Sequence, residues 1–178
     1  LVSALLPVKS PAPWLQEAIE SVLRQSYPNL ELVCVLDGFD AVLYEYLSKQ
    51  DRVRLVVIEF SAGPAEARRR AVEVATGTIA APIDADDVWL AHHVETLVAV
   101  LQHDPSVSLL GSNASNINAF GEVIPSHVQC GGDKTRDLLV RNPFVNSGSA
   151  FRLDRGCTCH RPVRVGRPAG RSHAGAQW

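Results

Sequence analysis

The chain of 178 residues is long enough to bury one hydrophobic core, and its 46% hydrophobic and 20% charged residues are typical of a soluble globular protein. Its net charge is −2, but residues 1–154 hold 12 basic and 19 acidic residues, a net charge of −7, whereas residues 155–178 hold five arginines and no acid. The acidic main part argues against a nucleic-acid partner, and no apolar run approaches the roughly 20 residues of a transmembrane helix.

The first residues are apolar but lack the basic segment of a signal peptide. Leu1–Leu6 is followed at once by Pro7, so we expect a strand here. The four cysteines show no spacing typical of a disulfide framework. We therefore expect a reducing, cytoplasmic location, and we leave peripheral association with the inner face of a membrane open.

Apolar periodicity predicts alternating strands and helices over the first 110 residues. The helices carry apolar residues at i, i+3, i+4 and i+7, and the strands are short apolar runs bounded by turn residues. This alternation predicts an α/β fold with a mostly parallel central sheet. The predicted strands are Val2–Leu6, Leu32–Leu36, Val53–Ile58, Ile79–Ile83 and Val107–Leu110, and the helices are Trp14–Ser26, Asp40–Lys49, Ala65–Ala75 and one through Val94–Leu101.

After residue 112 the alternation breaks. Ala119–Glu122 predicts a hairpin turn, Lys134–Arg141 a short helix and Ser149–Leu153 a further strand. From Gly156 onward Arg, Pro, Gly and Ala follow one another without periodicity, and we predict no regular structure there. The abrupt change of composition suggests the hypothesis that residues 155–178 are translated out of frame or come from a truncated gene.

Loops that follow the strands of a mostly parallel sheet lie along one edge, where such sheets bind ligands. Pro7, Asp37, Gly63 and the run Asp84-Ala85-Asp86-Asp87 all come at these strand ends. Three carboxylates within four residues repel one another unless a cation lies between them, and carboxylates suit Mg²⁺ or Mn²⁺. Taken alone, the run is more often a solvated loop with Asp87 as the N-cap of the next helix. Its position at the strand ends favours a metal–diphosphate site.

The common nucleotide-binding fingerprints are missing from the sequence. No Gly-x-Gly-x-x-Gly follows the first strand, and there is no Walker-type Gly-Lys-Ser/Thr. A cleft that binds a nucleotide must therefore hold it by other means. A carboxylate-bound metal ion that bridges the phosphates is the means that the acidic run offers.

The order of these motifs resembles glycosyltransferase family 2, whose members are nucleotide-sugar-dependent enzymes of the GT-A fold. The resemblance covers residues 2–154. Its motifs are Val2–Val8 as the opening strand, Leu15–Pro28 as the first helix, Leu36-Asp37-Gly38 in place of Asp-Asp-Gly, Ala67-Arg68 and Ala75-Thr76-Gly77 around the helix before the metal strand, and Asp84-Ala85-Asp86-Asp87 as the Asp-x-Asp motif.

The resemblance implies a fold, a division of the chain and a set of site residues. The fold is a GT-A-type, Rossmann-like three-layer α/β sandwich with an incomplete C-terminal part. Residues 1–112 would be the nucleotide-sugar-binding half, residues 113–154 a partial acceptor half, and residues 155–178 an irregular basic tail. The implied nucleotide-sugar-binding residues are Pro7, Val8, Asp37, Arg68, Asp84 and Asp86, with Asp86 and Asp84 as the metal ligands.

Each of these residues has a role by resemblance. Asp37 would bond the nucleotide base, the backbone of Pro7 and Val8 would line the base pocket, and Arg68 would lie beside the diphosphate. Asp84 would approach the ribose and sugar, and Asp86 would bind the metal ion that bridges both phosphates.

The chain departs from the family pattern in three places. Leu36 replaces the first Asp of the usual pair, and Lys9-Ser10 stands where an aromatic residue and Asn are common. Arg69-Arg70-Ala71 replaces the Asn-x-Gly that would follow Arg68. Arg68 to Arg70 sweep about 200° around a helix, so we expect one or two of them on a solvated face instead of in the cleft.

The general base that an inverting glycosyl transfer needs has no obvious candidate. In the resembling family it belongs to an acidic segment after a strand like Asn146–Arg152. No carboxylate follows Asp154. Glu122, Asp133, Asp137 and Asp154 all lack a matching position, so the catalytic residue is left unassigned.

Three further features receive the simpler interpretation. His92-His93 lacks the i, i+4 spacing of a helical metal pair, so we expect surface histidines. Trp89 is expected in the core. Cys157-Thr158-Cys159-His160 offers at most three clustered ligands, and we do not assign a metal to it.

The sequence therefore predicts a metal-assisted, inverting glycosyltransferase. Its partners would be a UDP-, GDP- or dTDP-sugar and an acceptor hydroxyl of a polysaccharide, a glycolipid or another cell-envelope glycan. Two alternatives stay open: a donor-binding domain that lacks the general base and does not transfer, and a metal-dependent nucleotidyltransferase. The latter usually has a basic Gly-rich loop after its first strand, which Pro7–Ser10 does not provide.

Overall fold

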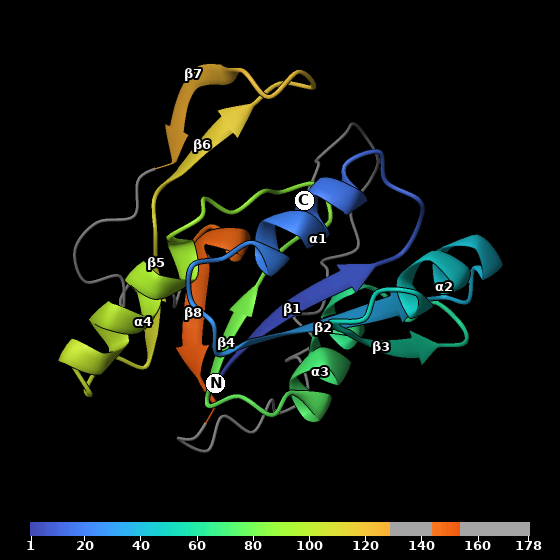
Figure 1. Ribbon diagram of the computed structural model, residues 1–178, viewed down its shortest axis with the longest axis horizontal. Helices are drawn as coiled ribbons and strands as arrows, with labels where there is room; N and C mark the ends of the chain where they lie inside the picture. Colours follow the sequence, from blue (N-terminus) through green and yellow to red (C-terminus); the bar gives the residue numbers. More distant parts are fainter. Residues whose placement is uncertain (129–143, 154–178) are drawn as a thin grey trace, which may run out of the picture.

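The structure is a computed structural model that describes residues 1–128 and 144–153 (Figure 1). The predictions for Lys134–Arg141 and for residues 155–178 lie outside the described residues. The elements are β1 (Val2–Val8), α1 (Leu15–Leu23), β2 (Leu30–Asp37), α2 (Ala41–Ser48), β3 (Val53–Ile58), α3 (Pro64–Val74), β4 (Ile79–Pro82), α4 (His93–His103), β5 (Leu109–Gly111), β6 (Ala114–Ile117), β7 (Val123–Val128), the 3₁₀ turn η2 (Asn146–Gly148) and β8 (Ser149–Arg152).

A six-stranded sheet in the order β3-β2-β1-β4-β8-β5 forms the centre of the fold (Figure 1). The strands β1 to β4 are parallel to one another, whereas β8 runs antiparallel to both β4 and β5. The predicted α/β fold with a mostly parallel sheet is therefore confirmed. The predicted turn at Ala119–Glu122 joins β6 and β7, which pair as a separate hairpin that extends away from the central sheet in Figure 1.

Alternating side chains of the central strands divide the core into two clusters, one on each face of the sheet. On one face, Val2, Ala4 and Leu6 pack with the apolar stripes of α1, α2 and α4. On the other face, Leu5 packs with Ala67 and Ala71 of α3, whose small side chains let the helix lie close to the strands. The fold is therefore a sandwich of helices, sheet and helix.

Several predicted element boundaries differ from the structure, and the hydrogen bonds give the reasons for the larger differences. The helix predicted over Trp14–Ser26 ends at Leu23, because the Ser26 N–H donates to the Ala91 carbonyl at 2.9 Å instead of continuing the helix. The strand predicted over Val107–Leu110 begins at Leu109, because Val107 belongs to the turn that ends α4, where its N–H donates to the Asp104 carbonyl.

Two further corrections concern the edge of the sheet where the loops converge. Pro7 was expected in a loop, but β1 continues through it to Val8; beyond Leu5 the strand pairs with β2 alone, and β4 ends at Pro82. The acidic run taken alone suggested Asp87 as the N-cap of the next helix. That helix, predicted through Val94–Leu101, begins at His93, and the Gln25 side-chain oxygen accepts the Val94 N–H at 2.9 Å. Asp87 is therefore not a helix cap.

Candidate functional site

A pocket of about 210 Å³ opens at the carboxyl ends of β1, β2 and β4, beside the first turns of α3. It gathers five of the six predicted nucleotide-sugar-binding residues, which come from four separate segments of the chain. Asp86, the sixth, is exposed on the loop that follows β4 and is not part of the pocket wall. The wall consists of Pro7, Val8, Lys9, Asp37, Pro64, Ala67, Arg68 and Asp84.

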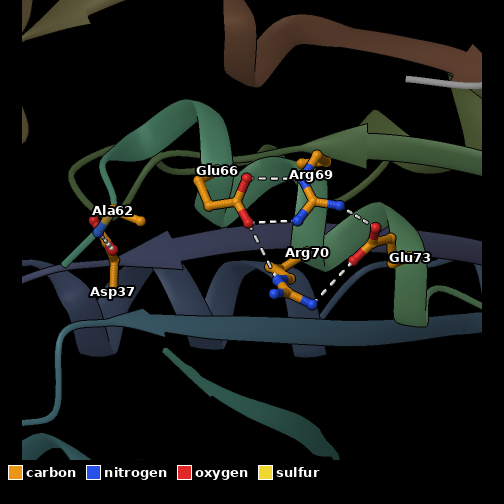
Figure 2. Close-up of polar contacts among 6 residues, drawn as sticks. All are labelled: Asp37, Ala62, Glu66, Arg69, Arg70 and Glu73. Carbon is orange, nitrogen blue, oxygen red and sulfur yellow. Dashed lines mark hydrogen bonds and ion pairs between the residues drawn. The ribbon is translucent and has the colours of Figure 1, made fainter. Parts of the chain in front are cut away.

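The Asp37 carboxylate is 3% exposed and organises the loop before α3. Its Oδ1 accepts the Ala62 N–H at 2.7 Å (Figure 2). Its Oδ2 accepts the Gly63 N–H at 3.0 Å and the Ser61 hydroxyl at 3.1 Å. A carboxylate has about four lone-pair positions, so one is left for a ligand donor. This geometry is compatible with the predicted bond to a nucleotide base.

Arg68 and Asp84 form an ion pair across the pocket. The Arg68 Nη2 donates to Asp84 Oδ1 at 2.6 Å, and the Asn146 side-chain amide donates to the same oxygen at 2.9 Å. The Arg68 Nε is buried and has no hydrogen-bond partner among the described residues. Arg68 and Asp84 both line the pocket wall, and no described side chain bonds Asp84 Oδ2.

The Ser147 hydroxyl joins the two ends of the acidic run Asp84–Asp87. Its Oγ accepts the Asp84 N–H at 2.9 Å and donates to Asp87 Oδ2. Burial raises the pKa of Asp87, and repulsion from Asp86 and Asp84 adds to the rise, while the bond from Ser147 opposes it. The three carboxylates therefore occupy different environments, with Asp87 half-buried and Asp86 exposed.

Trp89 and His93 pack beneath the acidic run. Trp89 is 5% exposed and donates its indole N–H to the Ser147 carbonyl at 2.6 Å, which confirms its predicted place in the core. His92 is exposed, as predicted, but the prediction for His93 is wrong, because its ring lies 4.9 Å from the Trp89 ring and is partly buried. Burial lowers the pKa of His93 to about 4, so it is neutral at pH 7.

Arg69 and Arg70, the two arginines that follow Arg68, lie on the outer face of α3. Arg69 bonds Glu66 and Glu73, and Arg70 bonds the same two carboxylates at 3.2 and 3.4 Å (Figure 2). These i, i+3 and i, i+4 pairs stabilise the helix. The helical phase predicted that the three arginines could not all face the cleft, and only Arg68 of the three lines the pocket.

Three residues of this region were not among the predicted site residues. Lys9 lines the pocket from the end of β1, and Asn146 and Ser147 reach the acidic run from η2. The sequence signal for Lys9 was its departure from the aromatic residue common at this position. Asn146 and Ser147 carry a weaker signal, a polar pair directly before a short apolar strand.

The acidic run does not form a complete metal site by itself. Among the residues that the structure describes, no three His, Cys, Asp or Glu side chains are grouped to hold a metal ion. Mg²⁺ in phosphate-binding enzymes is often held by one or two carboxylates together with substrate phosphates and water. The exposed Asp86, beside a pocket with a free Asp84 oxygen, fits that second kind of site.

The candidates for a general base gain no support from the structure. Glu122 lies in the turn between β6 and β7, where it accepts a bond from the Asn118 amide at 2.8 Å. Asp133, Asp137 and Asp154 lie outside the described residues.

No helix in the described ranges is long and apolar enough to cross a membrane.

Comparison with known proteins identifies the family. The family described as "Glycosyl transferase family 2" matches residues 3–173, and the chain therefore belongs to glycosyltransferase family 2. The matched range extends into the segment after residue 154, for which we expected an irregular tail.

Relatives and solved structures agree with this assignment. The chain is 33% identical over 120 residues, 66% of its length and 47% of the relative's, to an Escherichia coli protein named UDP-Glc:alpha-D-GlcNAc-diphosphoundecaprenol beta-1,3-glucosyltransferase WfgD. It is 33% identical over 99 residues, 53% of its length and 39% of the relative's, to the putative teichuronic acid biosynthesis glycosyltransferase TuaG of Bacillus subtilis. The chain thus spans less than half the length of these two relatives.

Two solved structures show the same fold. One is S. aureus TarS 1–349, with a TM-score of 0.59 and 18% identity over 85% of this chain and 46% of that one. The other is the mannosyltransferase PcManGT from Pyrobaculum calidifontis in complex with GDP-Man and Mn²⁺, with a TM-score of 0.59 and 22% identity over 85% of this chain and 44% of that one. The GT-A fold expected from the sequence is confirmed.

Proposed function

We propose that the pocket binds a nucleotide-diphosphate sugar and that the protein transfers the sugar to an acceptor hydroxyl with inversion. The observation that carries the proposal is the gathering of Pro7, Val8, Asp37, Arg68 and Asp84 around one pocket. Asp37 offers a lone pair for a base N–H, and the Arg68 guanidinium offers a cation beside the path of a diphosphate. Family membership favours glycosyl transfer over nucleotidyl transfer.

Mg²⁺ or Mn²⁺ is the proposed cofactor, with Asp86 as its main ligand and Asp84 as the second. A bound divalent ion would supply positive charge to the diphosphate that departs when the glycosidic bond breaks. The Arg68 guanidinium, which lines the pocket and pairs with Asp84, would share that role. The Mn²⁺ and GDP-Man of the Pyrobaculum neighbour support this proposal.

The proposed acceptor is a cell-envelope glycan or a lipid-linked saccharide. The support is the name of the Escherichia coli relative, whose acceptor is linked to diphosphoundecaprenol. A second candidate function is donor binding without transfer. The observation that favours it is that Glu122, the base candidate within the described residues, lies in the β6–β7 turn and bonds the Asn118 amide.

Calorimetric titration with UDP, GDP and dTDP and with their sugars, in Mn²⁺ or in EDTA, tests the proposal. We expect at least one nucleotide to bind, and to bind more tightly with the metal. Donor hydrolysis or transfer, measured next, separates an enzyme from a donor-binding domain. If none of these nucleotides binds, both candidate functions are overturned.

Asp86→Asn tests the metal assignment. We expect it to remove the gain in nucleotide affinity that Mn²⁺ provides and to leave the affinity in EDTA unchanged. Asp51→Asn is the matched control, because Asp51 is also exposed but precedes β3, at the opposite edge of the sheet. An Asp86→Asn variant with an unchanged metal dependence would show that Asp86 is not the ligand.

A further inference from the structure

The acidic run is held by a segment that lies about 60 residues later in the chain. The turn η2 precedes β8, and β8 pairs antiparallel with β4, the strand that leads into the run (Figure 1). This pairing brings Asn146 and Ser147 to the carboxyl end of β4. The contact between the two segments therefore follows from the topology of the sheet.

A single atom, Ser147 Oγ, fixes both ends of the run. A hydroxyl has one proton and two lone pairs. Here the proton is given to Asp87 Oδ2, and one lone pair accepts the Asp84 N–H at 2.9 Å. Ser147 is 6% exposed, and its carbonyl accepts the Trp89 indole N–H, so the segment from Asp84 to Trp89 is attached to this residue at three points.

Asn146 orients the first carboxylate of the run. Its amide and the Arg68 guanidinium donate to the same oxygen of Asp84, from η2 and from α3. The second oxygen of Asp84 is thereby turned away from both donors. With Asp84 and Asp87 both held, the exposed carboxylate between them is that of Asp86.

The turn itself is fixed against the neighbouring strand. The Gly148 carbonyl accepts the Ser112 N–H at 2.7 Å. A Cβ on Gly148 would lie 2.9 Å from the Ser112 hydroxyl oxygen and 3.2 Å from its carbonyl oxygen, so η2 packs closely against Ser112. This contact fixes the position of the turn beside the acidic run.

We infer that Asn146 and Ser147 are positioning residues that aim the Asp86 carboxylate at the cation of a metal–nucleotide complex by holding Asp84 and Asp87 at the ends of the run. The inference rests on the proposed function. Polar residues that orient metal ligands typically change metal affinity 10- to 100-fold when they are removed. The loss of the Ser147 hydroxyl would free both ends of the run at once.

The test compares Ser147→Ala with Ser149→Ala in calorimetric titrations with Mn²⁺ and UDP or GDP. Both serines are 6% exposed, but the Ser149 hydroxyl donates to the Asn146 carbonyl and touches no carboxylate. The quantity to compare is the nucleotide dissociation constant in EDTA divided by that in Mn²⁺. Ser147→Ala should lower this ratio about tenfold and leave the constant in EDTA within about twofold of wild type, and Ser149→Ala should change neither.

Each other outcome counts against the inference. An unchanged ratio in Ser147→Ala overturns it, and an equal loss of affinity with and without metal shows a merely structural role. If circular dichroism shows that Ser147→Ala does not fold, Asn146→Ala provides the same comparison, because the half-buried Asn146 side chain bonds Asp84 without touching the core. If the wild type binds no nucleotide, the proposed function fails first and this inference fails with it.

Discussion

Asp37→Asn should destabilise the protein through the loop that forms one wall of the pocket. In either orientation of the asparagine amide, its NH₂ group replaces an oxygen that now accepts a backbone N–H, either that of Ala62 or that of Gly63. The substitution therefore removes at least one charge-assisted bond and turns two N–H donors toward each other. Bonds of this kind are worth about 1.5–3 kcal/mol, so we expect a loss of roughly 2–4 kcal/mol in the free energy of unfolding.

Urea unfolding followed by circular dichroism measures this loss, and the thermal midpoint should fall by about 5–12 °C. Asp40→Asn is the matched control, because Asp40 accepts the Leu43 N–H as the N-cap of α2 and asparagine caps a helix equally well. We expect the control to stay within about 0.5 kcal/mol of wild type. Equal stabilities of the two variants would refute the role of Asp37 in the loop.

Three further predictions concern charge. Lys9→Ala should weaken UDP binding about tenfold and leave uridine binding unchanged, because Lys9 is exposed on the pocket wall and Arg68 is already paired. His93→Phe should flatten the pH dependence of unfolding. In the wild type the pKa of His93 is about 4 in the folded state and 6.5 in the unfolded state, so the free energy of unfolding falls as the pH drops from 6.5 toward 4. We expect this fall to be about 2 kcal/mol after allowance for partial exposure, and to be absent from His93→Phe. Burial alone would raise the pKa of Glu31, but bonds from Ser3 and Thr76 lower it, so the stabilisation that Glu31→Gln removes should be present above pH 4.5 and lost below it.

Simple measurements decide each case. Lys49→Ala is the control for Lys9→Ala, since Lys49 pairs with Glu45 of α2. If Lys9→Ala lost as much affinity for uridine as for UDP, Lys9 would contact the nucleoside instead of the diphosphate. Urea unfolding between pH 4 and 7 tests His93, with the exposed His92→Gln as control; identical slopes in wild type and His93→Phe contradict the prediction. For Glu31→Gln, a difference in thermal midpoint from wild type that persists at pH 3 would count against the assigned bonds.

The local elements were predictable, whereas the strand order was not. The apolar stripe of α1 and the continuous apolar run of β2 are properties of neighbouring residues, so periodicity reveals them. The insertion of β8 between β4 and β5 depends on pairs such as Ala80 with Phe151 and Leu110 with Ala150. No local pattern encodes a pairing over 40 to 70 residues, so the antiparallel strand in the sheet could be found only in the structure.

The site likewise contains residues that the sequence could predict and residues that it could not. The carboxyl-end rule predicted that Asp37 and Asp84 would lie at one edge, because this follows from the direction of the strands, and the family resemblance placed Arg68 beside them. Asn146 and Ser147 were missed because their contact with the acidic run exists only once β8 has joined the sheet. Their role as supports is a consequence of the tertiary fold.

The charges around the pocket explain why a nucleotide diphosphate should enter together with a cation. The Asp37 charge is compensated by the N–H groups of residues 62 and 63, and the Asp84 charge by Arg68 and Asn146. Asp87 is half-buried and bonded to a hydroxyl, so Asp86 is the exposed carboxylate of the run. A diphosphate and a carboxylate repel each other unless a divalent ion lies between them. Under the proposed function, η2 would therefore leave Asp86 as the carboxylate that needs a cation before a diphosphate can bind beside it.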